Sequence, residues 1–223
     1  MDHRKLGYRF DNDWTLERLE TVSVPYYKKI ETIPVNVEIK AEHIVLNLDS
    51  ARRILSKAHM ISVMDCACRT KRGNCNAPIN VCIDMNELAE RNIANGKSRE
   101  IDLDEALDIL EISHRAGLVH MALSNADIYK PDMINSICSC CSCCCSLLSG
   151  IIRFGLTLPI VNPVMISEIN VSNCNDCGIC VERCQFGARE MINGSLSYNP
   201  EMCFGCGLCV STCPTHAITL VNK

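Results

Sequence analysis

Two groups of four cysteines near the C-terminus share one spacing, C-x-x-C-x-x-C-x-x-x-C. The groups are Cys174, Cys177, Cys180 and Cys184, and then Cys203, Cys206, Cys209 and Cys213. Gly178 and Ala188 recur at the matching positions as Gly207 and Ala217, so this region is an internal repeat. Thiolates bind soft metal ions, and this spacing is typical of iron held in two [4Fe–4S] clusters. Zinc is the alternative, but zinc sites usually combine two C-x-x-C pairs.

The repeat also predicts how the two clusters share their ligands. Three cysteines of one half bind one cluster, and the fourth reaches the cluster of the other half. Cluster I is therefore assigned to Cys174, Cys177, Cys180 and Cys213, and cluster II to Cys203, Cys206, Cys209 and Cys184. Glycines at 178, 205 and 207 would let backbone N–H groups approach the sulfurs. Cys213 is followed by Pro214, as is usual, whereas Cys184 is followed by Gln185, which changes the turn but removes no ligand.

Ten further cysteines precede this repeat in two sets. One set is Cys66, Cys68, Cys75 and Cys82, and the other is Cys138, Cys140, Cys141, Cys143, Cys144 and Cys145. Free thiols at this density would oxidise readily, so all ten are candidate ligands of additional iron–sulfur centres. They suffice for one or two further clusters or for one larger cluster, and another metal or unliganded thiols are the alternatives. The spacing does not choose between these arrangements.

Four of the basic residues that lie among these cysteines are considered for a role at a metal centre. Arg69 and Arg72 would stabilise thiolates or an anionic cluster, or they are solvated loop residues. His120 is a candidate ligand or proton donor, and otherwise a histidine satisfied near the surface. His114 is expected to face solvent.

Composition limits the class of protein. The chain has 223 residues, 18 of them cysteine, with a net charge of −4 and 48% hydrophobic residues. The negative charge argues against nucleic-acid binding, and no transmembrane segment is expected because Arg153, Pro159 and Pro163 interrupt the most apolar stretch. The first residues lack the apolar core of a signal peptide, so a cytoplasmic location and reduced thiols are expected.

Several secondary-structure elements must position these cysteines. A strand is expected over residues 32–39 and a helix from Asp49 or Ser50 to about Met60. Two capping boxes predict helices from Asp84 to Gly96 and from Asp102 to Gly117. The expected fold is α+β, with a cysteine-rich, mostly helical domain over residues 1–165 and a dicluster ferredoxin domain over residues 166–223.

From about residue 50 to the end, the chain resembles a known family. The resemblance rests on the two ferredoxin motifs together with the following stretches: Cys66-x-Cys68-Arg69, Cys75 with Pro78, Cys82, residues 96–101, 105–107 and 117–120, and Ile137–Cys145. These are similar to the 4Fe–4S dicluster, ferredoxin-type iron–sulfur proteins of strict anaerobes that carry a cysteine-rich region ahead of the ferredoxin. The resemblance implies iron–sulfur cofactors and an anaerobic source.

Three functions are compatible with these patterns. The first is an electron-transfer protein that passes single low-potential electrons through two [4Fe–4S] clusters to a redox partner protein. The second is an oxidoreductase whose N-terminal cysteines hold a reactive iron–sulfur centre, although no G-x-G-x-x-G motif or P-loop is present. The third is storage or delivery of a soft metal by residues 138–145. Electron transfer is the favoured prediction, and an enzyme activity is left open.

Overall fold

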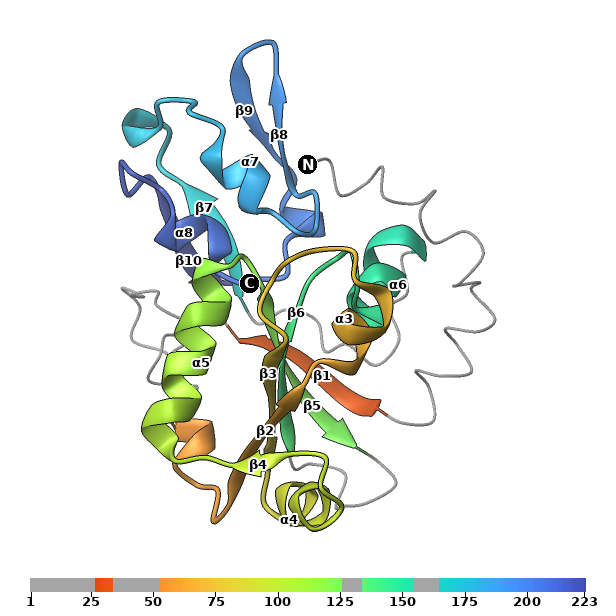
Figure 1. Ribbon diagram of the computed structural model, residues 1–223. Coiled ribbons are helices and arrows are strands. Elements are labelled where there is room, and N and C mark those ends of the chain that lie inside the picture. The colour runs from red at the N-terminus through yellow and green to blue at the C-terminus, as the bar shows by residue number, and fades with distance from the viewer. Residues whose placement is uncertain (1–26, 34–52, 126–133, 155–164) are drawn as a thin grey trace.

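A six-stranded antiparallel sheet lies at the centre of the N-terminal part of the protein (Figure 1). The computed structural model describes residues 27–33, 53–125, 134–154 and 165–223. The strand order is β1-β5-β6-β3-β2-β4. The strands are β1 (Tyr27–Ile33), β2 (Ile61–Asp65), β3 (Asn80–Met85), β4 (Arg99–Glu100), β5 (Val119–Asn125) and β6 (Ser136–Cys140).

Among the described residues, four helices of six or more residues accompany this sheet. They are α3 (Ala67–Arg72), α4 (Glu87–Ala94), α5 (Leu103–Arg115) and α6 (Ser146–Phe154). The expectation of a mostly helical N-terminal domain therefore missed the sheet. The apolar alternation that marks half-buried strands is absent here, because β3 and β6 are buried on both faces over much of their length and β6 reads Ser-Ile-Cys-Ser-Cys.

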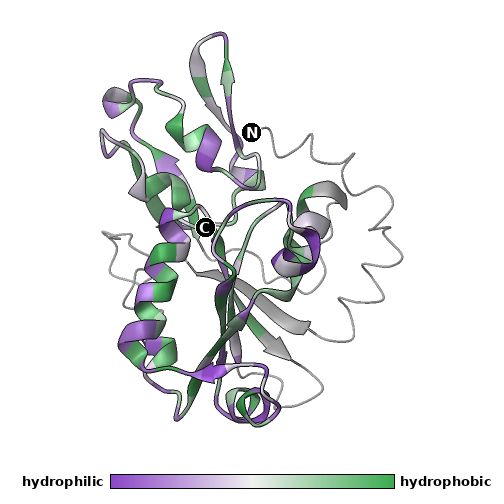
Figure 2. Cartoon of the chain, in the orientation of Figure 1, coloured by the Kyte–Doolittle hydropathy of each residue, from purple (hydrophilic) through white to green (hydrophobic). Residues whose placement is uncertain are grey.

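The amphipathic helix predicted from Asp102 is confirmed as α5. The Asp102 carboxylate accepts a hydrogen bond of 2.8 Å from the backbone N–H of Glu105, which satisfies one donor at the first turn. Ala106 and Leu110 are fully buried beneath the sheet, and the helix shows alternating apolar and polar stripes in Figure 2. Gly117 then adopts a φ of 80°, which ends the helix and leads into β5.

The helix predicted from Asp84 starts later than expected. Asp84 lies inside β3, and the N-cap of α4 is Asn86, whose side chain makes no capping hydrogen bond. The capping-box pattern is wrong here because Asp84 is paired in the sheet, where it opposes Ser62 and Ser136. Tertiary pairing overrides the local signal.

Two further predictions lie partly outside the described residues. The strand expected over residues 32–39 is seen only where β1 ends at Ile33, and residues 34–39 are not described. The cap positions Asp49 and Ser50 are also outside the described residues, and the helical turn at 53–55 ends well before Met60.

The C-terminal region forms a small repeat of its own. It contains β7 (Met165–Ile169), α7 (Ile179–Arg183), β8 (Arg189–Ile192), β9 (Ser195–Tyr198), α8 (Leu208–Ser211) and β10 (Ile218–Asn222), with short 3-10 helices at Val171–Asn173 and Pro200–Met202. Strand β7 pairs with β10, and β8 pairs with β9 in a hairpin that projects from the molecule in Figure 1. Gly178 and Gly207 occupy equivalent caps of α7 and α8, each with a φ of 76°.

The described residues contain three apolar clusters: one inside the N-terminal part, one that joins the two parts, and a small one around Met165 and Leu220. The first joins the sheet to α5 and includes Ile83, Leu110 and Ile137, with Cys141 and Cys144 at its edge. The second packs Val119 and Met121 of β5 against Phe186 of the C-terminal region. Within the described part of the chain, no helix combines the length and apolar character that a membrane crossing requires.

Candidate functional site: two groups of thiols beside a ferredoxin-type repeat

The ten N-terminal cysteines separate into a group of six and a group of four. The six-thiol cavity has a volume of about 340 Å³ and is lined by all of Cys66, Cys68, Cys82, Cys138, Cys140 and Cys145. Its thiols come from three elements, namely the start of α3, strand β3, and the chain from β6 to the start of α6. The sheet pairing brings these segments together, since β6 lies directly beside β3.

The thiols of this cavity interact with one another. The Cys82 thiol contacts those of Cys66 and Cys138, and the Cys145 thiol contacts those of Cys140 and Cys68. Hydrogen bonds with Cys140 and Cys82 lower the pKa of Cys138 to about 6, against the opposing effect of burial. The donor set is that of an iron–sulfur site, in which deprotonated cysteines are the usual ligands.

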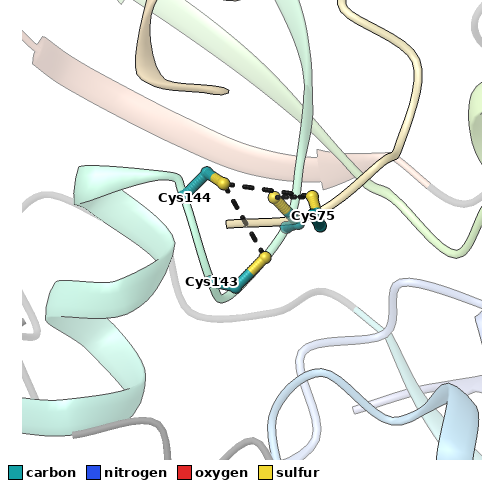
Figure 3. Close-up of side chains that lie close together, drawn as sticks. Cys75, Cys143 and Cys144 are labelled. Carbon is teal, nitrogen blue, oxygen red and sulfur yellow. Dashed lines mark hydrogen bonds between the residues drawn. The ribbon is translucent and has the colours of Figure 1, made fainter. Parts of the chain in front are cut away.

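The remaining four cysteines form the four-thiol group, Cys75, Cys141, Cys143 and Cys144. Their sulfur atoms all lie within 4.8 Å of one another, and Figure 3 shows Cys75 facing Cys143 and Cys144. The Cys75 sulfur lies 3.7 Å from that of Cys141 and 3.9 Å from that of Cys144. Loop 141–144 therefore directs its thiols away from the six-thiol cavity, while Cys140 and Cys145 on either side line that cavity.

Arg69 is the buried cation beside the four-thiol group, with 1% of its surface exposed. Its guanidinium donates to the carbonyl of Pro78, to the carbonyl of Ser139 at 3.0 Å and to the Cys141 sulfur at 3.5 Å. Burial opposes the charge, but the neighbouring thiols of Cys141, Cys66 and Cys75 hold the pKa of Arg69 above its ordinary value. Of the two interpretations of Arg69, the structure supports the one in which it stabilises thiolates.

Arg72 and Asn74 donate hydrogen bonds to the backbone of the same loop, 141–144. Arg72 donates to the carbonyl of Cys144 at 2.7 Å, and Asn74 donates to the carbonyl of Cys143 at 2.9 Å. The segment after α3 therefore holds the backbone of the cysteine loop as well as supplying Cys75.

We expect Arg69→Met to destabilise the protein strongly. The substitution leaves the carbonyls of Pro78 and Ser139 without this donor, and each buried acceptor that loses its partner costs about 1–3 kcal/mol. Anaerobic thermal unfolding measures the loss, with Lys71→Met on the exposed side of α3 as the matched control. Equal melting temperatures for the two variants would show that Arg69 carries no such role.

The six-thiol cavity also contains polar residues that the sequence patterns did not single out. Asp84 is buried and accepts hydrogen bonds of 2.7 Å from Ser136 and 2.8 Å from Asn92. Burial raises the pKa of the Asp84 carboxyl. The sequence shows a carboxylate two residues after Cys82, but the capping-box pattern predicts a helix start there and not a site residue.

The eight C-terminal cysteines also fall into two spatial groups. Cys174, Cys177, Cys180 and Cys213 all line one small cavity, so that the last cysteine of the second half lies with the first three of the first half. Around the second group, burial raises the pKa of Cys206, and the neighbouring Cys209, Cys184 and Cys203 add to the increase. This placement fits the predicted exchange of ligands between the halves, and the assignment itself stays a prediction.

Arg189 lies between the two C-terminal groups of thiols. It is buried, it donates to the Ser167 hydroxyl at 2.7 Å, and its guanidinium stacks 4.5 Å above the centre of the Tyr198 ring. Burial opposes its charge, but Cys209 and Cys180, one from each group, raise the pKa of Arg189. A single buried cation therefore faces both groups of thiols.

Gln185 joins the C-terminal region to the cysteine loop. Its side-chain oxygen accepts a hydrogen bond of 3.2 Å from the backbone N–H of Ser142, and its side-chain nitrogen donates to the carbonyl of Gly117 at 2.9 Å. The departure from Cys-Pro at this position thus has a structural reason, because proline has no side-chain group that could make these contacts.

Two histidines lie at the contact between the C-terminal region and the N-terminal part, which we call the joint. Neither histidine faces solvent. The expectation for His114 is wrong: its ring is 3% exposed and contacts the Ser211 hydroxyl of α8 at 2.6 Å. His120 is 1% exposed, so it lies in the interior and not near a surface; its Nδ1 contacts the Ser139 hydroxyl at 3.0 Å, whereas its buried Nε2 has no hydrogen-bond partner among the described residues. Burial lowers the pKa of His114 to about 4 and that of His120 to about 3, which keeps both rings neutral.

An apolar layer completes the joint. Phe186 stacks on Phe204 with ring centres 4.6 Å apart. The same packed cluster contains Cys140 and Cys145 from the six-thiol cavity, and Cys184 and Cys206 pack against it from the C-terminal region. One apolar cluster therefore lies between Cys140 and Cys145 of the six-thiol cavity and Cys184 and Cys206 of the C-terminal region.

Comparison with known proteins identifies the C-terminal repeat. A family model described as a 4Fe-4S binding domain, Fer4, matches residues 167–190 and again residues 196–219. No curated protein matches the chain. The C-terminal region is therefore a ferredoxin-type iron–sulfur region, and its two matches coincide with the two halves of the cysteine repeat.

Proposed function

We propose that this protein is an iron–sulfur electron-transfer protein that holds two [4Fe–4S] clusters in its C-terminal region and a further iron–sulfur centre in the six-thiol cavity. Cys174, Cys177, Cys180 and Cys213 would hold cluster I, and Cys203, Cys206, Cys209 and Cys184 would hold cluster II. When bound, such clusters accept and release single electrons at low potential.

The observation that carries this proposal is the apolar joint between the two parts of the protein. Cys184 and Cys206 belong to the proposed cluster II, and they pack against the same cluster of side chains as Cys140 and Cys145 of the cavity. The buried Phe186 excludes water from this contact. At the opposite end, Cys177 is exposed, so the proposed cluster I lies where a redox partner protein can approach.

Iron and acid-labile sulfide per chain, measured on anaerobically purified protein, test this proposal. The two C-terminal clusters account for about eight irons, so a centre in the cavity requires more than this. In Cys138→Ala we expect only the excess iron to be lost, with the electron paramagnetic resonance signal of the reduced C-terminal clusters unchanged. About eight irons in the unaltered protein would overturn the third centre, and far fewer would overturn the proposed function.

A second candidate function has one observation in its favour. The six-thiol cavity has room beyond its thiols, and it contains the Asp84 carboxyl, whose pKa is raised by burial. A centre at this position would have a proton donor beside it, as an oxidoreductase needs. Addition of cyanide to the reduced protein distinguishes the two functions, because a spectrum that changes favours a reactive centre and an unchanged spectrum favours a carrier.

A further inference from the structure

The four-thiol group and the other thiols differ in how closely their sulfur atoms approach. Among the described residues, Cys75, Cys141, Cys143 and Cys144 are the one set of three or more histidine, cysteine or carboxylate side chains whose ligand atoms all lie within 4.8 Å. No three thiols of the ferredoxin-type repeat meet that condition, and no three thiols of the six-thiol cavity do so. The sulfur atoms of the four-thiol group are thus closely spaced, whereas those of the other thiol groups are more widely spaced.

This spacing is that of four ligands on one ion. A tetrahedral ion with metal–sulfur distances near 2.3 Å places its sulfurs about 3.8 Å apart. The distances here are 3.7 Å for Cys75 to Cys141, 3.9 Å for Cys75 to Cys144 and 3.8 Å for Cys143 to Cys144. The thiolates of a [4Fe–4S] cube bind four different irons at its corners, so they stand farther apart. The distances also exceed the ~2.05 Å of a disulfide bond.

The surroundings suit a tetrathiolate ion as well. Four thiolates around a divalent cation leave a net negative charge, and the buried Arg69 donates to the Cys141 sulfur at 3.5 Å. Arg72 and Asn74 hold the carbonyls of Cys144 and Cys143, which orients the two adjacent thiols toward Cys75. Cys141 and Cys144 are buried and Cys75 and Cys143 are half-buried, so none of the four is exposed, as expected of a structural site.

We propose that Cys75, Cys141, Cys143 and Cys144 bind a single tetrahedral zinc ion and not an iron–sulfur cluster. The ion fastens the segment after α3 to the loop between β6 and α6. The elements that lead into these two segments, α3 with its N-cap and β6, carry Cys66, Cys68, Cys138 and Cys140 of the six-thiol cavity, and the loop itself ends at Cys145. The zinc site therefore sets the position of five of the six thiols around the cavity without carrying electrons itself.

Metal analysis of the full-length protein, produced with both iron and zinc present, tests the proposal. We expect about one zinc per chain in the unaltered protein, and loss of that zinc to background in Cys75→Ser. Cys138→Ser, a matched change in the six-thiol cavity, should retain its zinc. Cys75→His should also retain zinc, because three cysteines and one histidine are, like four cysteines, a usual ligand set of structural zinc sites.

X-ray absorption at the zinc edge on the unaltered protein decides the matter if Cys75→Ser does not fold. The expected spectrum has four sulfur ligands at about 2.3 Å and no second metal nearby. Absence of zinc, zinc with oxygen or nitrogen ligands, or zinc retained in full by Cys75→Ser would each overturn the site. A mononuclear iron signal that vanishes in Cys75→Ser would overturn the assignment to zinc. None of these outcomes depends on the iron count that tests the electron-transfer function.

Discussion

Cys184→Ala is expected to remove about four irons, half of those in the ferredoxin-type region, by destroying the cluster of Cys203, Cys206 and Cys209. Cys184 lies with that group and not with the other, since it adds to the raised pKa of Cys206 and of Cys209. The cavity of the first group is lined by Cys213 instead. Iron analysis and the paramagnetic resonance spectrum of the dithionite-reduced variant measure the effect.

The mirror variant is Cys213→Ala, which we expect to damage the cluster of Cys174, Cys177 and Cys180 and to leave the other intact. Each variant then retains the signal of a single cube, without the coupling between two neighbouring paramagnets. If Cys184→Ala instead loses the cluster of Cys174, each half of the repeat binds its own cluster and the crossed assignment is wrong.

The second large effect is expected for Gln185→Ala, which removes the polar link between the ferredoxin-type region and the cysteine loop. Gln185 is 8% exposed, and truncation removes its hydrogen bonds with the N–H of Ser142 and the carbonyl of Gly117. A typical hydrogen bond contributes about 0.5–1.5 kcal/mol to stability, so losing these two is expected to cost about 1–3 kcal/mol. Anaerobic unfolding measures the stability, and the rate at which the N-terminal centre is reduced measures the contact between the two parts.

Glu182→Ala is the matched control, because Glu182 is exposed on the neighbouring helix α7. Iron content should be normal in both variants, since neither residue is a thiol. Gln185→Pro is more informative still, because it restores the usual Cys-Pro sequence and removes both hydrogen bonds. Unchanged stability and an unchanged rate of reduction in Gln185→Ala and Gln185→Pro would show that the apolar packing of Phe186 holds the joint without help.

Local patterns were sufficient for much of the ferredoxin-type region. Its cysteine spacing encodes a loop that wraps one metal cluster, and that information is contained within a few consecutive residues. The family comparison supports the same region. The start of α5 was also predictable, because the Asp102 cap is a contact between residues three positions apart. The Asp84 cap failed for the opposite reason, since pairing with β6 depends on residues far away in the chain.

The sequence by itself determined which residues can bind metal and that the C-terminal half-repeats belong together. It could not divide the ten N-terminal cysteines, because adjacent residues such as Cys140 and Cys141 face opposite sites. Only the tertiary structure decided that division, by pairing β6 with β3 and by bringing Cys75 against the loop. Likewise, His114 has no local mark of burial, and it becomes buried because α8 packs over it. Spacing along the chain encodes ligands within one loop, whereas ligands from separate segments meet only through the packing that joins those segments.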